Sequence, residues 1–138
     1  MRIILPKLVC GCYAMTNGEK KMVEDLFDSG SFMQSLGGDA GLASELLEAY
    51  LEDSLVRAEE LGRALDEGDA PAAAKAAHSL KGMSGVVRAS RLVSMALEME
   101  VASRDARLDQ VRAMRPNLDE TLHETLGLML AFLQTLKQ

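Results

Sequence analysis

The sequence predicts an all-α fold, an up-and-down antiparallel four-helix bundle with a short additional N-terminal helix. Three observations predict this class. Of the 138 residues, 48% are hydrophobic but only 4% are aromatic, and nine are methionine, a composition typical of helices that pack through Leu, Ala and Met. Apolar residues recur every three or four positions over long stretches, which is the spacing of one helix face. Aspartate, glycine and proline stand where these stretches begin and end.

The first residues of the chain show no clear pattern of a folded element. Residues 1–15 (MRIILPKLVCGCYAM) contain an apolar run that Pro6 and Lys7 interrupt, and the run is too short for a signal peptide. We expect either a tail or an over-extended gene start. Cys10 and Cys12 have no partners at the spacing of a disulfide framework or a zinc site, so we expect reduced thiols.

The next segment leads into the bundle. Residues 16–30 are polar and rich in turn-forming residues, and a short helix is predicted over 31–36. We therefore divide the chain into an N-terminal tail at 1–24 and a four-helix bundle at 25–138.

The first long helix is predicted from Ala40 to about Glu67. Gly37 and Gly38 end the preceding piece, and Asp39 is well placed as the N-cap because its carboxylate can accept the free N–H groups of the first turn. One apolar face follows from the spacing of Leu47, Leu51, Leu55, Ala58, Leu61 and Leu65.

The second helix is predicted from Ala70 to about Val87. Gly68 fits the end of the helix before it, Asp69 fits the N-cap, and Pro71 lies in the first turn, where its missing N–H has no cost.

Two further helices complete the predicted bundle. The third runs from about Ser90 to Ser103, and its apolar face consists of Leu92, Met95, Ala96 and Met99. The fourth occupies the C-terminus, with Leu118, Leu122, Leu126, Met129, Leu133 and Leu136 on one face. Pro116 leaves two alternatives open: residues 108–115 belong to the same helix, kinked at Pro116, or the helix restarts there.

The second helix carries an unusual outer face. Its inward side consists of Ala73, Ala76, Ala77, Leu80, Met83 and Val87, and its outward side of Lys75, His78, Lys81, Gly82, Gly85 and Arg88. A glycine inside a helix costs about 1 kcal/mol relative to alanine. Two of them on one exposed face therefore indicate a purpose other than helix stability.

Phosphoryl transfer gives each of these residues a use. A neutral imidazole at His78 is a nucleophile near neutral pH. Lys81, one turn later, would place an ammonium beside the phosphoryl oxygens. Gly82 would leave bare backbone against which a partner protein can press.

The segment AAHSLKGMSGVVRASRL, residues 76–92, resembles the signature of histidine-containing phosphotransfer (HPt) domains of two-component phosphorelays. These domains are four-helix bundles whose exposed histidine shuttles a phosphoryl group between aspartates of receiver domains. The resemblance covers roughly residues 26–137. It implies that His78 is the phosphoacceptor, that Lys81 supports the phosphoryl group and that Gly82 belongs to the docking surface.

The sequence departs from the family at Arg88, where members often have glycine. A continued helix would place Arg88 on the same face as Lys81, seven residues earlier. We expect Lys75, Gly85 and Arg88 to join the partner-binding surface and Arg88 to influence partner choice. A local basic patch on a chain of net charge −6 suits the acidic active site of a receiver and predicts salt-sensitive association.

Several function classes are excluded. The net charge of −6 argues against nucleic-acid binding, and no stretch approaches the ~18 apolar residues of a membrane span. The chain lacks a Gly-rich nucleotide loop and room for an ATP-binding domain, so we expect no ATP-dependent kinase activity. Ser79 follows His78, where histidine-kinase dimerisation helices have an acidic residue.

We therefore expect a cytoplasmic, monomeric phosphoryl carrier. His78 would accept a phosphoryl group from the receiver domain of a hybrid sensor histidine kinase and pass it to a response regulator. We expect no cofactor and no metal ion on this chain, with Mg²⁺ held by the partner receiver. The alternative is a non-catalytic adaptor that binds and titrates a receiver, which would keep its activity in a His78→Gln variant. His123 has no lysine at the supporting position and is expected to be a solvated residue.

Overall fold

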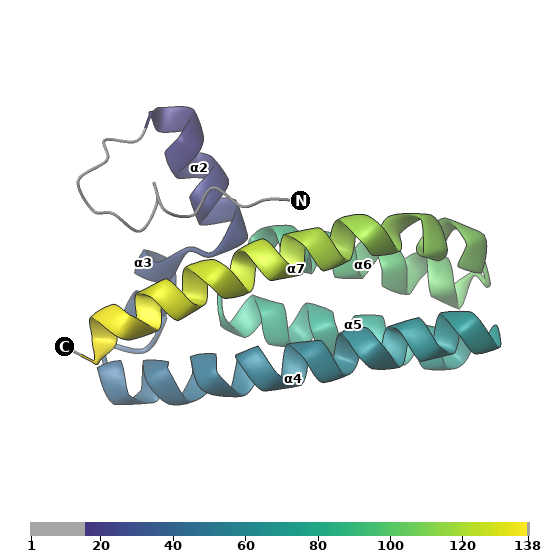
Figure 1. Cartoon of the computed structure of the whole chain (residues 1–138), viewed down its shortest axis with the longest axis horizontal. Helices are drawn as coiled ribbons and strands as arrows, with labels where there is room; N and C mark the ends of the chain where they lie inside the picture. Colours follow the sequence, from purple (N-terminus) through teal and green to yellow (C-terminus); the bar gives the residue numbers. More distant parts are fainter. Residues whose placement is uncertain (1–15, 138) are drawn as a thin grey trace.

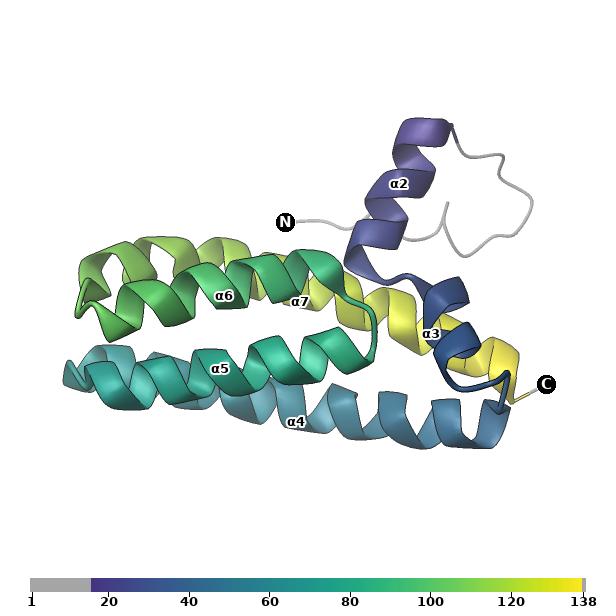
Figure 2. The same ribbon diagram turned by 180° about the vertical axis from the view of Figure 1, so that it is seen from behind.

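The computed structural model describes residues 16–137, and within this range the chain forms six helices and no strand (Figure 1). Four long helices lie side by side: α4 (Ala40–Glu67), α5 (Ala70–Val86), α6 (Ser90–Arg104) and α7 (Leu108–Leu136). Each runs antiparallel to the one before it, α5 contacts both α4 and α6, and α7 closes the bundle against α6 and α4 (Figures 1 and 2). The predicted all-α bundle is confirmed.

Side-chain caps fix where α4 and α5 begin. Oδ1 of Asp39 accepts the backbone N–H of Leu42 at 3.0 Å, and Oδ1 of Asp69 accepts that of Ala72 at 3.1 Å. These bonds satisfy N–H groups that have no partner within the helix. Gly68 ends α4 in the left-handed conformation, with φ at 69°, which glycine adopts without steric cost. Both predicted caps and the predicted stop are confirmed.

Pro116 lies inside α7, which continues through it without a break. One helix across Pro116 is therefore confirmed, and a helix that restarts there is wrong. A proline within a helix removes one backbone hydrogen bond. Val111 before it and Leu118 after it are both buried, so packing against the core holds the helix on either side of the missing bond.

Two short helices precede the bundle. α2 (Asn17–Leu26) occupies most of the segment that the sequence predicts to be turn-rich, so that prediction is wrong. The cause is a capping box: Oγ1 of Thr16 accepts the N–H of Glu19 at 3.1 Å, and the Glu19 carboxylate accepts the N–H of Thr16 at 3.0 Å, which satisfies two free donors together. The short helix predicted at 31–36 is confirmed as α3 (Ser29–Ser35), which begins two residues earlier and ends one residue earlier than predicted.

α2 crosses the predicted division between a tail at 1–24 and a bundle at 25–138, because residues 17–24 are helical and continuous with the two that follow. Residues 1–15 lie outside the described part of the chain. The expectations of a tail or an over-extended start, and of reduced thiols at Cys10 and Cys12, stay predictions.

Phe27, directly after α2, attaches the N-terminal segment to the bundle. Its buried ring lies 5.6 Å from the ring of Phe132 in α7 and 6.0 Å from that of Phe32 in α3, measured between centroids. α2 itself rises away from the bundle axis above this contact, near the end where α5 connects to α6 (Figure 2).

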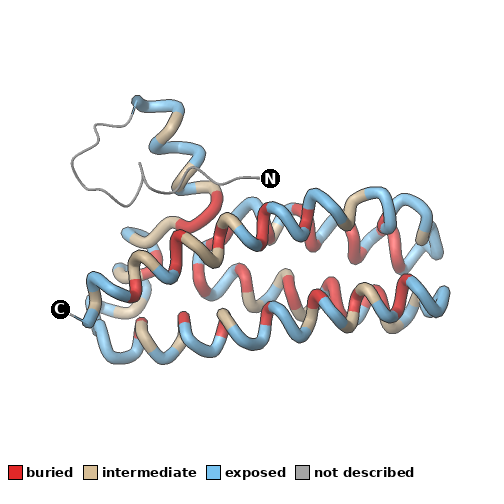
Figure 3. The backbone as a smooth tube through the Cα atoms, in the orientation of Figure 1, coloured by how far each residue is buried: buried red, intermediate tan, exposed pale blue. Residues whose placement is uncertain are grey.

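The core runs along the bundle between the four long helices (Figure 3). The predicted inward position of Leu55 is wrong, because 52% of this residue is exposed. At 3.6 residues per turn, Leu55 lies about 80° around the helix from Leu47, whereas Ser54 lies only about 20° from it. Ser54 is accordingly fully buried.

Candidate functional site

α5 turns one side to the core and the other to solvent. Ala73, Ala76, Ala77, Leu80 and Val87 are buried as predicted, whereas Met83 is only partly buried. His78 lies near the middle of the outer side, with 61% of its side chain exposed. The predicted orientation of His78 is confirmed.

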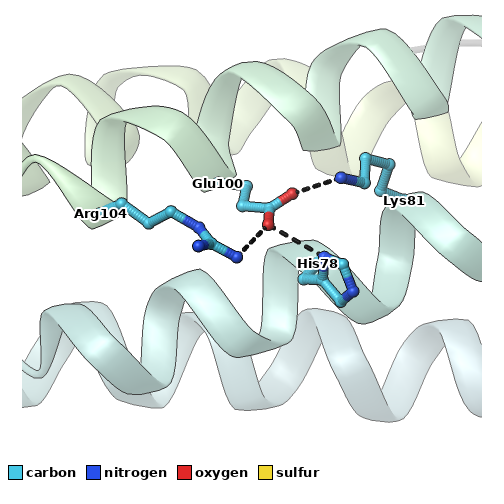
Figure 4. Close-up of polar contacts among 4 residues, drawn as sticks. All are labelled: His78, Lys81, Glu100 and Arg104. Carbon is cyan, nitrogen blue, oxygen red and sulfur yellow. Dashed lines mark hydrogen bonds and ion pairs between the residues drawn. The ribbon is translucent and has the colours of Figure 1, made fainter.

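Glu100, which the sequence analysis did not single out, meets three cationic or titratable groups at the contact between α5 and α6 (Figure 4). Nδ1 of His78 lies 2.9 Å from its Oε2, and Nζ of Lys81 lies 2.7 Å from its Oε1. Nη2 of Arg104, one turn later on α6, donates to Oε2 at 2.6 Å. One carboxylate thus holds an imidazole, an ammonium and a guanidinium.

Burial makes this pairing necessary. Only 5% of the Glu100 side chain is exposed, and a buried carboxylate is tolerated only when cations and hydrogen bonds compensate for lost water. Lys81 contributes most, and together with Arg104 and His78 it lowers the pKa of Glu100 to about 2 even though burial raises it. The carboxylate is therefore ionised at neutral pH.

The ionised carboxylate fixes the position of the proton on His78. A carboxylate only accepts hydrogen bonds, so the bond to Glu100 requires a proton on Nδ1. In the neutral ring, Nε2 then carries the free lone pair. Nε2 lies on the side of the ring away from Glu100 (Figure 4). The outcome is an exposed ring whose outer nitrogen is the nucleophilic one.

Lys81 and the imidazole of His78 contact the same carboxylate, that of Glu100. Its ammonium forms an ion pair with Glu100, and 28% of its side chain is exposed. The structure therefore brings together His78 and Lys81, as predicted, but connects them through a third residue.

Gly82 and Gly85 leave the outer side of α5 uncovered. A Cβ added at Gly82 meets no atom within 4 Å, and one at Gly85 meets only Cγ2 of Val93, at 4.0 Å. Neither residue has a positive φ. Gly62 in α4 differs, because a Cβ there would overlap the guanidinium of Arg115. Nothing within the described chain therefore requires glycine at positions 82 and 85.

Arg88 lies beyond the end of α5, in the connection to α6. The helix stops at Val86, and Arg88 has a left-handed backbone with φ at 62°. The prediction that a continued helix places Arg88 on the face of Lys81 is therefore wrong. The N–H of Ala89 donates to the carbonyl of Ser84 at 2.9 Å, which closes the end of the helix. In a helix end of this kind, the left-handed residue is usually glycine.

The remaining predicted residues lie apart from Glu100. Lys75 is exposed one turn before His78, and His123 is exposed on α7, where it lines a groove between α4 and α7. Within residues 16–137, no three or more His, Cys, Asp or Glu side chains are grouped so as to hold a metal ion. No helix in that same range is long and apolar enough to cross a lipid bilayer.

One signal in the sequence could have revealed Glu100. It follows Ala96 by four residues, so it continues the apolar face of α6, and an acidic residue at a buried position needs a cation nearby. Which cation it meets depends on how α5 and α6 are aligned, and that alignment comes from packing.

Comparison with known protein families gives one match. The family model described as "Hpt domain" matches residues 45–136, a range that covers more than half of the chain and includes His78, Lys81 and Glu100. Searches of curated proteins and of solved structures gave no match. Hpt domains are histidine-containing phosphotransfer modules that interact with receiver domains in phosphorelays. This chain belongs to the Hpt domain family.

Proposed function

We propose that this chain carries a phosphoryl group on Nε2 of His78, between the aspartate of a hybrid-kinase receiver domain and the aspartate of a response regulator. The observation that carries the proposal is the hydrogen bond between His78 and Glu100. Because the ionised carboxylate can only accept, this bond keeps the proton of the neutral ring on the inner nitrogen, Nδ1, and leaves the outer nitrogen, Nε2, free to react.

The proposed transfer needs no movement of a proton on this chain. Nε2 attacks the phosphorus of a phosphoaspartate, the N–P bond forms as the P–O bond breaks, and the electron pair stays on the aspartate oxygen. The ring then carries a positive charge and keeps its proton on Nδ1, where the carboxylate of Glu100 offsets that charge. In the second transfer, the next aspartate attacks phosphorus and the electron pair of the N–P bond returns to Nε2.

Lys81 is the proposed electrostatic support for the phosphoryl oxygens. Its ammonium is ion-paired with the carboxylate of Glu100, which Arg104 also contacts. Arg104 can therefore keep Glu100 paired when Lys81 turns toward the incoming oxygens. Such a positioned cation stabilises the charge that develops on the transferring group.

The partner supplies the rest of the proposed machinery. We place Mg²⁺ in the acidic pocket of the receiver, assign no metal or cofactor to this chain and propose no ATP-dependent kinase activity for it. Gly82 would let the receiver approach the backbone of α5, since no side chain covers that position.

A labelling experiment tests the proposal. The chain is phosphorylated with a small phosphoramidate, and receiver domains from the same genome are then added while the label is followed. We expect label on the wild type and on a His123→Gln control, and rapid loss of that label to one or two receivers. A His78→Gln variant should take up no label. If this variant affects receivers as the wild type does, the chain is an adaptor that titrates receivers.

A further inference from the structure

A second feature lies next to the His78 side of α5. A groove of about 500 Å³ separates α2 from the connection between α5 and α6. One side is formed by α2 and the residues after it, and the other by Gly85 and Arg88 at the α5–α6 connection. Three carboxylates line the first side, Glu24, Asp25 and Asp28. Asp25 is paired with Lys21 at 3.9 Å, and Asp28 accepts the N–H and the hydroxyl of Ser31, so two of the three already have partners within the chain.

The two sides of this groove are joined by hydrogen bonds. The backbone N–H of Asp28 donates to the carbonyl of Arg88 at 3.0 Å, and the hydroxyl of Ser90 donates to the carbonyl of Asp25 at 3.2 Å. These bonds connect the segment around α2 to the start of α6, so the position of α2 relative to α5 is set by the fold.

Arg88 occupies this groove at a cost to the fold. Its φ of 62° places its Cβ close to the following carbonyl oxygen, a strain that glycine avoids. Within residues 16–137, its exposed guanidinium forms no ion pair. Nothing in the described fold therefore compensates for an arginine in a conformation that suits glycine, which points to a contact outside the chain.

The distances place Arg88 at the edge of a docked partner. A helix rises about 1.5 Å per residue, so Gly85 lies about 10 Å from His78 along α5 and Arg88 at most about 15 Å away. A specific interface covers about 800 Å² on each partner, which corresponds to a disc of radius about 16 Å. A receiver centred on His78 would cover Gly85 and reach the groove beside it. Charges at the rim of an interface chiefly control association rate and partner choice.

We infer that the groove between α2 and the α5–α6 connection is a second contact site for the receiver that docks on His78, and that Arg88 binds an acidic side chain of the receiver there. This inference rests on the proposed function. Arg88 selects between receivers, whereas His78 and its neighbours perform the transfer with each of them.

An Arg88→Gly variant tests the inference, and the chain contains a matched control. Ala106 also has a left-handed backbone, with φ at 58°, and it lies in the α6–α7 connection at the opposite end of the bundle (Figure 2). Arg88→Gly and Ala106→Gly each relieve strain and should raise Tm by about 3 °C. Phosphoramidate labelling, which involves no receiver, checks that His78 of each variant is reactive before transfer is measured.

Only the Arg88 variant should change the encounter with receivers. We expect Arg88→Gly to slow association with the preferred receiver about tenfold. The difference in association rate between the preferred receiver and poorer ones should also become smaller. Stopped-flow transfer from phosphorylated His78 measures both. Arg88→Lys should retain much of the wild-type rate. A misfolded variant would instead lower Tm.

Two results would overturn the inference and are distinguishable. If Arg88→Gly associates as fast as Ala106→Gly with each receiver that accepts the label, the second contact is absent while the proposed function stands. If no receiver removes the label from the wild-type chain, the proposed function fails and the inference fails with it.

Discussion

Oε2 of Glu100 lies 2.9 Å from Nδ1 of His78, although the two residues are 22 positions apart and on different helices. This contact joins the fold to the proposed chemistry. Packing of α5 against α6 buries the carboxylate, and the buried carboxylate determines which nitrogen of the exposed ring holds the proton. The properties of His78 thus depend on a residue that solvent barely reaches.

Replacing Glu100 by glutamine should change the pH dependence of stability. The pKa of Glu100 is lowered from 4.5 to about 2 in the folded chain. A lowered pKa adds stability that is fully present above the unfolded value and is lost as pH falls through the folded value. Between pH 4.5 and pH 2, the wild type should lose up to about 3 kcal/mol more than Glu100→Gln. Urea unfolding across that range would measure the difference, and parallel curves for the two proteins would contradict the assigned ion pairs.

Replacing Lys81 by alanine should slow phosphoryl transfer while the bundle remains folded. The variant loses the cation that we place beside the phosphoryl oxygens, and a rate loss of about 10²-fold is typical for one such donor. Glu100 keeps Arg104 as a partner, so we expect a stability loss of only about 1–2 kcal/mol. Circular dichroism would check the fold and rapid-quench transfer the rate. Unaltered transfer kinetics would remove the role assigned to Lys81.

Substitutions at Gly82 should separate helix stability from docking. Gly82→Ala should stabilise the chain by about 1 kcal/mol, because a Cβ there meets no atom within 4 Å. Gly82→Trp should leave the chain folded but weaken receiver binding, since it fills the uncovered backbone. Gly62→Ala is the control that should gain less, because the guanidinium of Arg115 must move aside. Thermal unfolding and receiver titration would measure both properties. Unchanged receiver affinity in Gly82→Trp would argue against docking at this position.

Much of the fold was predictable because it depends on local chemistry. Asp39, Gly68 and Asp69 specify helix ends through their own backbone and side-chain bonds, and these bonds involve residues only a few positions apart. The capping box at Thr16 is equally local. The sequence does not predict the helix that begins there, because α2 contains too few apolar residues to show a helical spacing.

Properties that depend on packing between helices were not predictable in the same way. Leu55 fits an apolar spacing of four but lies outside the buried face, whereas Ser54 lies within it. His78 and Lys81 share a helix, so their proximity follows from spacing. Glu100 joins them only through the alignment of α6 against α5. The left-handed backbone of Arg88 likewise depends on where α5 ends, which is at Val86, two residues before Arg88.

The position of the phosphoryl group on the phosphorylated chain tests the central claim most directly. Nitrogen-15 and phosphorus-31 NMR after treatment with phosphoramidate would identify the modified atom. The account predicts an N–P bond at Nε2 of His78, a proton retained on Nδ1 and no modification of His123. Phosphorylation at Nδ1, at His123 alone, or at neither histidine would contradict it.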